Sequence, residues 1–98
     1  MTAHWIINEY LEACSLPQNL AGAFPALVEP LVGIGYMPVL YCGHQRVHGT
    51  NYMLICKRTP FVPGFPSTLV KCVIHETLPV AGQRNYHIVA IEDFMVIH

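Results

Sequence analysis

Six histidines and four cysteines are the side chains of this 98-residue sequence most suited to binding a metal or attacking a substrate. His44 and His48 are four residues apart, a spacing that gathers two metal ligands on one face of a helix. Both lie in a predicted loop, where the spacing does not have that effect. His75 and His87 fall in two neighbouring predicted strands, where they could face each other as solvated side chains. The histidines therefore predict no metal site.

The cysteines at positions 14, 42, 56 and 72 are widely spaced and form no C-x-x-C motif. This spacing argues against a zinc site or a thioredoxin-type redox site. We interpret Cys14, Cys42, Cys56 and Cys72 as buried thiols that pack like small apolar side chains. If their two strands pair, Cys56 and Cys72 become neighbours, and a disulfide there would need Cα atoms within about 7 Å.

The carboxylates do not form a catalytic pair. Glu92 and Asp93 are adjacent in a predicted strand, so their side chains point to opposite faces. This arrangement separates them as a general acid and base. No serine or cysteine has a base close to it in the sequence. We therefore expect no catalytic residue and no cofactor, and we predict that the protein is not an enzyme.

The composition restricts the partners of the protein. Apolar residues make up 53% and charged residues 11%, against about 25% charged residues in a typical domain. The surface must therefore expose apolar area, and we expect a homo-oligomer. A net charge of −1 without a basic run argues against nucleic acid. No apolar run reaches the roughly 20 residues that span a bilayer, and the start lacks the features of a signal peptide, so we expect neither membrane insertion nor export.

The segment from Tyr36 to Thr59 predicts a β-hairpin that would position several of these side chains. Two runs rich in β-branched and aromatic residues flank a short polar break that contains Gly43 and Gly49. This is the local pattern of a hairpin. We place its tip at Gln45 to Gly49, and we expect Gly49 to adopt a positive φ in the turn.

Before the hairpin, the chain predicts a short strand and one helix. His4 to Ile7 is an apolar run that favours a strand, and a helix from Ala3 to Cys14 is the alternative. Ser15 to Gln18 has the pattern of a capping box, with Ser15 as the N-cap. A helix of about four turns is then expected to present an apolar stripe made of Leu20, Phe24, Leu27, Val28 and Leu31.

The remaining elements are strands and loops. The hairpin strands are expected at about 35–44 and 50–59, followed by strands at 67–77 and from 86 to about 94. Pro38 cannot donate to a ladder, which predicts an edge, a bulge or the end of the neighbouring strand. The helix can cover only one face of the sheet, so the other face or an edge is a candidate partner surface.

Gln45-Arg46-Val47-His48-Gly49 resembles Q-x-V-x-G, the first-hairpin motif of the cystatins, which inhibit papain-like cysteine peptidases. The segment from Leu31 to Pro60 is similar to small bacterial cystatin-like proteins with a V-G-x-x-Y-x-P-V pattern followed by G-x-Q-x-V-x-G-T-N-Y. The order of one strand, one helix and four strands is also that of cystatins. The resemblance implies a single α+β domain over residues 1–98, with one helix packed across a four- to five-stranded antiparallel sheet.

In cystatins, the N-terminus, the first hairpin and the second hairpin loop form a wedge that enters the peptidase cleft. Carried over to this chain, the resemblance assigns the wedge to Ala3, His4, Trp5, Gln45, Arg46, Val47, His48, Gly49, Pro79, Val80, Ala81, Gly82 and Gln83. Two positions differ from the family. The N-terminal segment keeps its tryptophan but lacks a glycine, and the second loop has Pro79-Val80 where cystatins commonly have Pro-Trp.

The resemblance implies a protein that binds, and through its wedge inhibits, a papain-like cysteine peptidase. An alternative from a different class is a non-inhibitory module that uses the same fold to homodimerise or to recognise another protein. Its basis is the low charge, the two-sided apolar sheet and the second loop without an aromatic residue.

Overall fold

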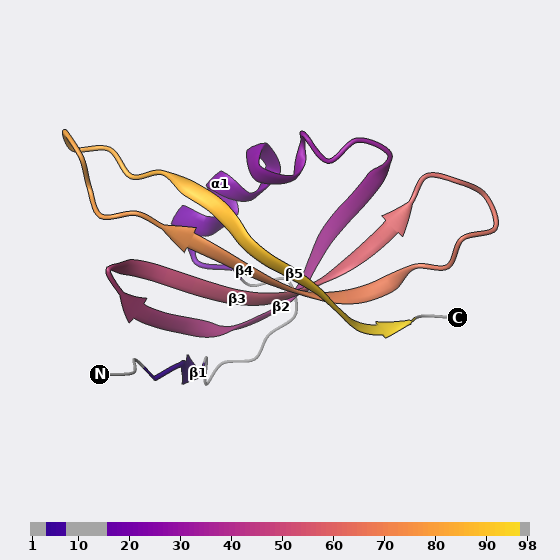
Figure 1. Ribbon diagram of the computed structural model, residues 1–98, viewed down its shortest axis with the longest axis horizontal. Coiled ribbons are helices and arrows are strands. Elements are labelled where there is room, and N and C mark those ends of the chain that lie inside the picture. Colours follow the sequence, from indigo (N-terminus) through magenta and orange to yellow (C-terminus); the bar gives the residue numbers. More distant parts are fainter. Residues whose placement is uncertain (1–3, 8–15, 97–98) are drawn as a thin grey trace.

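The computed structural model describes residues 4–7 and 16–96, which form one helix packed against a five-stranded antiparallel sheet (Figure 1). In chain order the elements are β1 (Ile6–Ile7), α1 (Gln18–Val28), β2 (Ile34–Val47), β3 (Gly49–Pro60), β4 (Thr68–Glu76) and β5 (Tyr86–Val96). The α+β class and the order of elements predicted from the sequence are confirmed. The strand at Ile6–Ile7 also decides against a helix at that point.

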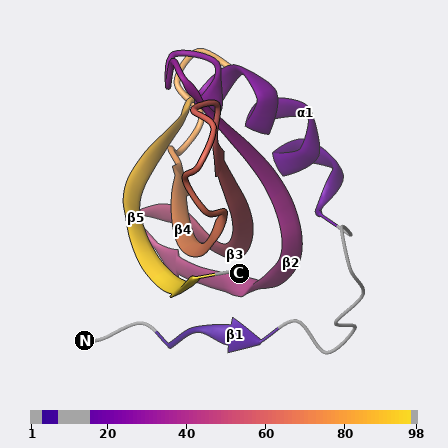
Figure 2. The ribbon, with the colours of Figure 1, turned by 90° about the vertical axis from the view of Figure 1, so that its right-hand side faces the viewer.

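The strands lie side by side in the order of the chain, and each neighbouring pair is antiparallel. The sheet is strongly curved, with β1 lying beyond β2 and β5 at the opposite side (Figure 2). β1 pairs only with His44 and Gly43, so it covers a short part of the β2 edge. β5 is the other edge strand.

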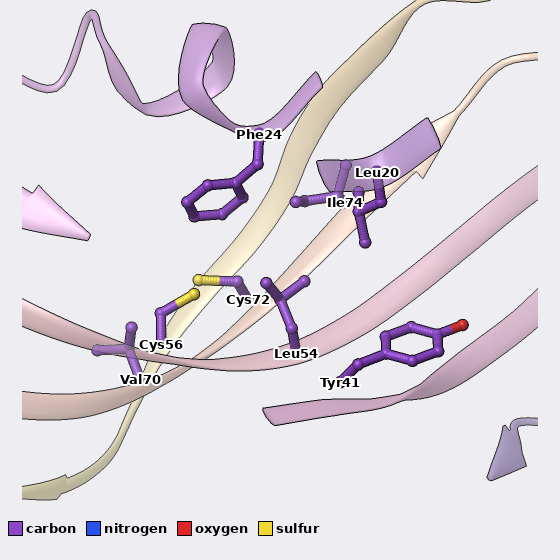
Figure 3. Close-up of a cluster of buried hydrophobic side chains, with 8 residues drawn as sticks. All are labelled: Leu20, Phe24, Tyr41, Leu54, Cys56, Val70, Cys72 and Ile74. Carbon is purple, nitrogen blue, oxygen red and sulfur yellow. The ribbon is translucent and has the colours of Figure 1, made fainter. Parts of the chain in front are cut away.

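The core lies between α1 and one face of the sheet (Figure 3). Leu20 and Phe24 of the predicted apolar stripe are buried, and Leu27 and Val28 pack at the margin. Each fully buried leucine or phenylalanine contributes about 1.5–3 kcal/mol, which holds the helix on this face. The sheet side of the core consists of Tyr41, Leu54, Cys56, Val70, Cys72 and Ile74.

The helix begins later than the sequence pattern predicts. Pro17 is the N-cap with ψ of 142°, and no side chain caps the helix. A capping box with Ser15 as the N-cap would make Gln18 the third helical residue. This prediction is wrong, because Gln18 is the first helical residue. Ser15 lies outside the described residues. The helix has 11 residues, about three turns rather than four. It continues through Pro25, whose carbonyl accepts a hydrogen bond from Glu29 N–H.

Pro38 lies at an irregularity of β2, as predicted. The β2–β3 register shifts between Pro38 and Leu40, which is a bulge. A second shift lies between Tyr41 and Gly43. Together these bends help β2 to follow the curvature of the sheet.

Cys56 and Cys72 are buried side by side beneath Phe24, with their sulfur atoms adjacent (Figure 3). Both are free thiols, so the disulfide alternative is not realised and the interpretation as buried thiols is confirmed for this pair. The hydrogen bond shared with Cys72, and then burial, raise the pKa of the Cys56 thiol. Cys56 therefore stays protonated and acts as an apolar side chain. Cys42 is a half-buried free thiol, and Cys14 lies outside the described residues.

Within residues 4–7 and 16–96, no helix is both long and apolar enough to cross a membrane.

Candidate functional site

The first hairpin is tighter than the sequence pattern predicts. Val47 pairs with Gly49, so His48 is the residue at the turn. Gln45 and Arg46 belong to the ladder, opposite Asn51 and Thr50. The expectation of a five-residue tip is therefore corrected: polar side chains do not prevent pairing, because the ladder uses only backbone groups.

Gly49 closes this turn and contacts the next strand. Its φ is +107°, which confirms the expected positive value. A Cβ atom at this position would lie 2.4 Å from the carbonyl oxygen of Glu76 and 2.9 Å from the His75 ring. Both the conformation and the close approach of β4 therefore require glycine.

Gln45 begins a row of polar side chains on the outer face of the sheet, the face opposite α1. Asn51 Nδ2 donates to Gln45 Oε1 at 3.1 Å, and Asn51 Oδ1 lies 2.7 Å from His75 Nδ1. The His75 ring lies 5.2 Å from the ring of His87, its partner on β5. The predicted position of these two histidines across a strand pair is confirmed. Gln45 is thus held by hydrogen bonding rather than projecting freely from a loop.

Glu76, at the end of β4, is a buried carboxylate that sequence reasoning missed; it is only 4% exposed. Four side chains donate to it: Tyr86 at 2.5 Å, Asn19 at 2.9 Å, Tyr52 at 3.3 Å and Arg84 at 3.4 Å. These donors come from β5, α1, β3 and the β4–β5 loop, so one carboxylate links four segments. The available signal was its position in the strand, because Glu76 lies two residues after Ile74 and so shares the face of the buried residues Val70, Cys72 and Ile74.

The pKa of Glu76 follows from this environment. Burial raises it, but the hydrogen bonds from Tyr86 and Asn19, the charge of Arg84 and the hydrogen bond from Tyr52 together hold the pKa below its ordinary value of 4.5. Burial and the hydrogen bond to Glu76 raise the pKa of Tyr86. At neutral pH the pair is therefore a carboxylate acceptor and a phenol donor.

A hollow of about 180 Å³ separates the two hairpins at this end of the sheet. It brings together residues that the sequence assigned to different parts of the wedge, from the first hairpin and from the segment after β4. Its lining consists of Arg46, Val47, Gly49, Thr50, Glu76, Thr77, Leu78, Pro79 and Arg84.

The β4–β5 loop extends beyond this hollow and ends in a turn of its own (Figure 1). Val80 and Gln83 exchange backbone hydrogen bonds of 2.8 and 3.0 Å. The turn residues Ala81 and Gly82 have φ of +53° and +78°, the signs of a type I′ turn. Arg84 connects the base of the loop to Glu76, and the five residues from Pro79 to Gln83 are exposed.

The N-terminal segment reaches the same end of the sheet. Ile6 pairs with His44 in an antiparallel register, so His4 and Trp5 run towards the tip of the first hairpin (Figure 1). His4 is exposed and Trp5 is half-buried. Ala3, the other N-terminal residue assigned to the wedge, lies outside the described residues.

Gly43 allows β1 to pair with β2. A Cβ atom on Gly43 would lie 2.1 Å from the carbonyl oxygen of Ile6, which is backbone and cannot rotate away. The sequence pattern placed Gly43 near the end of the first hairpin strand, next to the polar break, and in the structure it lies inside β2 opposite Met53. Its function is to admit a neighbouring strand.

We expect Gly43→Ala to detach β1 while leaving the other four strands paired. The energetic cost of the clash with Ile6 exceeds the stabilisation that pairing of only two residues provides. Amide hydrogen exchange should show loss of protection at Ile6 and Ile7, with the β3 and β4 amides unchanged. Gly22→Ala, whose Cβ would meet no atom within 4 Å, is the control and should leave Ile6 and Ile7 protected. Equal protection of these two amides in wild type and Gly43→Ala would contradict this account of β1.

Among the residues that the structure describes, no group of three or more histidine, cysteine, aspartate or glutamate side chains is arranged to hold a metal ion. Glu92 pairs with Lys71, and Asp93 pairs with Arg58 across the other face, so the two carboxylates are engaged separately. The site is a surface of two hairpins and an N-terminal strand.

Comparison of the chain with protein-family models, curated proteins and solved structures finds no match.

Proposed function

We propose that this protein binds a papain-like cysteine peptidase through the end of the sheet that carries both hairpins, and inhibits it by occupying the cleft. The observation that carries the proposal is the hollow between the hairpins. Arg46, Val47 and Gly49 of the Q-x-V-x-G motif line it together with Pro79 of the second loop. Motif and second loop thus form one surface.

The rigidity of this end supports the proposal. Gly49 lies against the backbone of Glu76, and the Glu76 carboxylate holds Arg84 at the base of the second loop. A surface fixed before binding loses little conformational entropy on binding, which favours affinity. Val47 is 44% exposed and Val80 is 71% exposed, so apolar side chains are available on both hairpins.

The ladder also explains why such a surface would resist cleavage. Gln45, Arg46 and Val47 pair with residues of β3, so their backbone groups are already hydrogen bonded within the sheet. A peptidase needs a substrate whose backbone can extend along the cleft and present an aligned scissile bond. A tight hairpin fills the cleft without meeting that need.

Titration of papain with the wild-type protein and Val47→Asp tests the proposal. We expect micromolar or tighter inhibition by the wild type and at least about tenfold weaker inhibition by Val47→Asp, because a charge would be buried in the interface. Val62→Asp is the matched control: Val62 is also exposed but lies in the β3–β4 loop at the other end of the sheet (Figure 1). Absence of inhibition by the wild type, or equal loss in both variants, would contradict the proposal.

A second candidate function is self-association through β5. Val89, Phe94 and Met95 on this edge strand are exposed. An apolar edge strand can pair with a strand of another molecule, here a second copy of the chain. Light scattering over a range of concentrations tests this candidate. A mass equal to the monomer at every concentration would exclude it and leave the peptidase proposal unaffected.

A further inference from the structure

The outer face of the sheet carries a second hollow, of about 330 Å³, near the start of β2 and the end of β3. Gly35 pairs with Thr59 and Met37 pairs with Lys57. These residues alternate with Cys56 of the core, so they lie on the face away from α1. The lining consists of Gly35, Tyr36, Met37, Lys57, Thr59 and Phe61.

Gly35 and Phe61 create this hollow. Gly35 has no side chain, and a Cβ there would lie 3.0 Å from Cζ of the Phe61 ring. Phe61 N–H donates to Gly33 O at 2.9 Å, which holds the ring above the strand. The ring is nevertheless 68% exposed, and Met37 is 53% exposed. Two apolar side chains that line the hollow are therefore open to solvent, and a bound molecule would cover them.

Lys57 supplies a positive charge at the hollow. Within the described part of the chain it forms no ion pair. The nearby Lys71 on the same face is paired with Glu92 at 3.0 Å, which neutralises that charge. One unpaired ammonium beside apolar walls complements a ligand with one negative charge and an apolar body.

We propose that this hollow binds a small aromatic monocarboxylate. The carboxylate would meet the Lys57 ammonium, and the aromatic ring would lie between Phe61 and Met37, where ring–ring and sulfur–ring contacts are favourable. The volume is at the lower end of the range for small-molecule sites, which suits a single ring with a short acid chain. The site is independent of the proposed peptidase surface, because it lies at the other end of the β2–β3 hairpin.

Titration with 3-phenylpropionate, followed by amide NMR shifts of the full chain, tests this proposal. We expect saturable shifts centred on Gly35, Met37 and Thr59 at about millimolar concentration or below. The neutral amide, 3-phenylpropionamide, should bind at least about fivefold more weakly, because it lacks the charge that pairs with Lys57.

Two variants separate the charge from the shape of the site. Lys57→Met removes the charge but keeps an apolar stem, and should weaken binding about tenfold. Gly35→Val fills the hollow and should abolish the shifts. Lys71→Met is the matched control and should bind within about twofold of wild type. Retained amide dispersion in each variant reports that the fold persists. Absence of saturation by about 10 mM, or equal binding of acid and amide, would overturn the proposal.

Discussion

Gly49→Ala is expected to lower the free energy of unfolding by about 3 kcal/mol, or the melting temperature by about 15 °C. An alanine would need a φ of +107° and would place its Cβ 2.4 Å from the Glu76 carbonyl oxygen. Because the Glu76 carbonyl belongs to the backbone and cannot rotate away, the hairpin and β4 must separate to relieve the overlap. That movement would break ladder bonds between β3 and β4 and open the hollow between the hairpins. Urea and thermal unfolding followed by circular dichroism measure the loss.

Gly64→Ala isolates the contribution of the close contact. Gly64 also has a positive φ, +91°, but a Cβ there would meet no atom within 4 Å. Only the conformational strain remains, and we expect a loss of about 1 kcal/mol. If the two variants lost the same stability, the contact with Glu76 would not be the reason for glycine at position 49.

The second large effect is expected for Glu76→Gln, which should lower the free energy of unfolding by about 3 kcal/mol at neutral pH. The substitution keeps the size of the side chain but removes the charge that accepts hydrogen bonds from Tyr86 and Asn19 and pairs with Arg84. Removing a buried charge that accepts several hydrogen bonds leaves some of the donor groups without an acceptor. Because the partners lie on four segments, the β4–β5 loop should also lose order, visible as faster amide exchange at Arg84 and Asn85.

The contribution of Glu76 to the free energy of unfolding depends on pH, and the direction of its pKa shift determines whether it grows or falls. The pKa of Glu76 in the folded state is below its ordinary value of 4.5. Its contribution to stability is therefore complete above that value and is lost as the pH falls through the folded-state pKa. Unfolding free energies of wild type and Glu76→Gln should converge as the pH falls from 4.5 through the folded-state pKa of Glu76.

Glu92→Gln is the control for the pH experiment. Glu92 forms an exposed ion pair with Lys71, and such pairs contribute about 0.5 kcal/mol or less. This variant should follow the wild-type curve closely. A difference in unfolding free energy between wild type and Glu76→Gln that does not shrink as the pH falls below 4.5 would show that the ionised carboxylate is not the stabilising group.

Several parts of the fold follow from local sequence alone. Apolar spacing predicts that Leu20 and Phe24 face the sheet, because side chains three or four residues apart share a helix face. Strand propensity and turn residues predict the four long strands and their order. Pro38 marks a bulge because proline has no N–H for the ladder. Each of these inferences uses neighbours within a few positions of the chain.

Local signals were weaker where strands end and helices begin. Gln45 and Arg46 were assigned to a loop because they are polar, yet they pair with β3. Backbone pairing and the hydrogen bonds of Gln45 with Asn51 outweigh the low strand preference of polar residues. Gln18 is the first residue of α1 rather than the third, because Pro17 adopts an extended ψ and is the N-cap.

Only the tertiary structure decided how the two hairpins, the N-terminal strand and the two hollows are built. Glu76 gathers Asn19 and Tyr86, which lie 67 positions apart in the chain, and no local pattern relates such residues. Gly43 is required by the carbonyl of Ile6, and Gly49 by the carbonyl of Glu76. Sequence periodicity reports which face of an element is apolar, because it depends on the geometry of one segment. Close approaches and shared hydrogen bonds depend on how distant segments pack, and they emerge only when the sheet has formed.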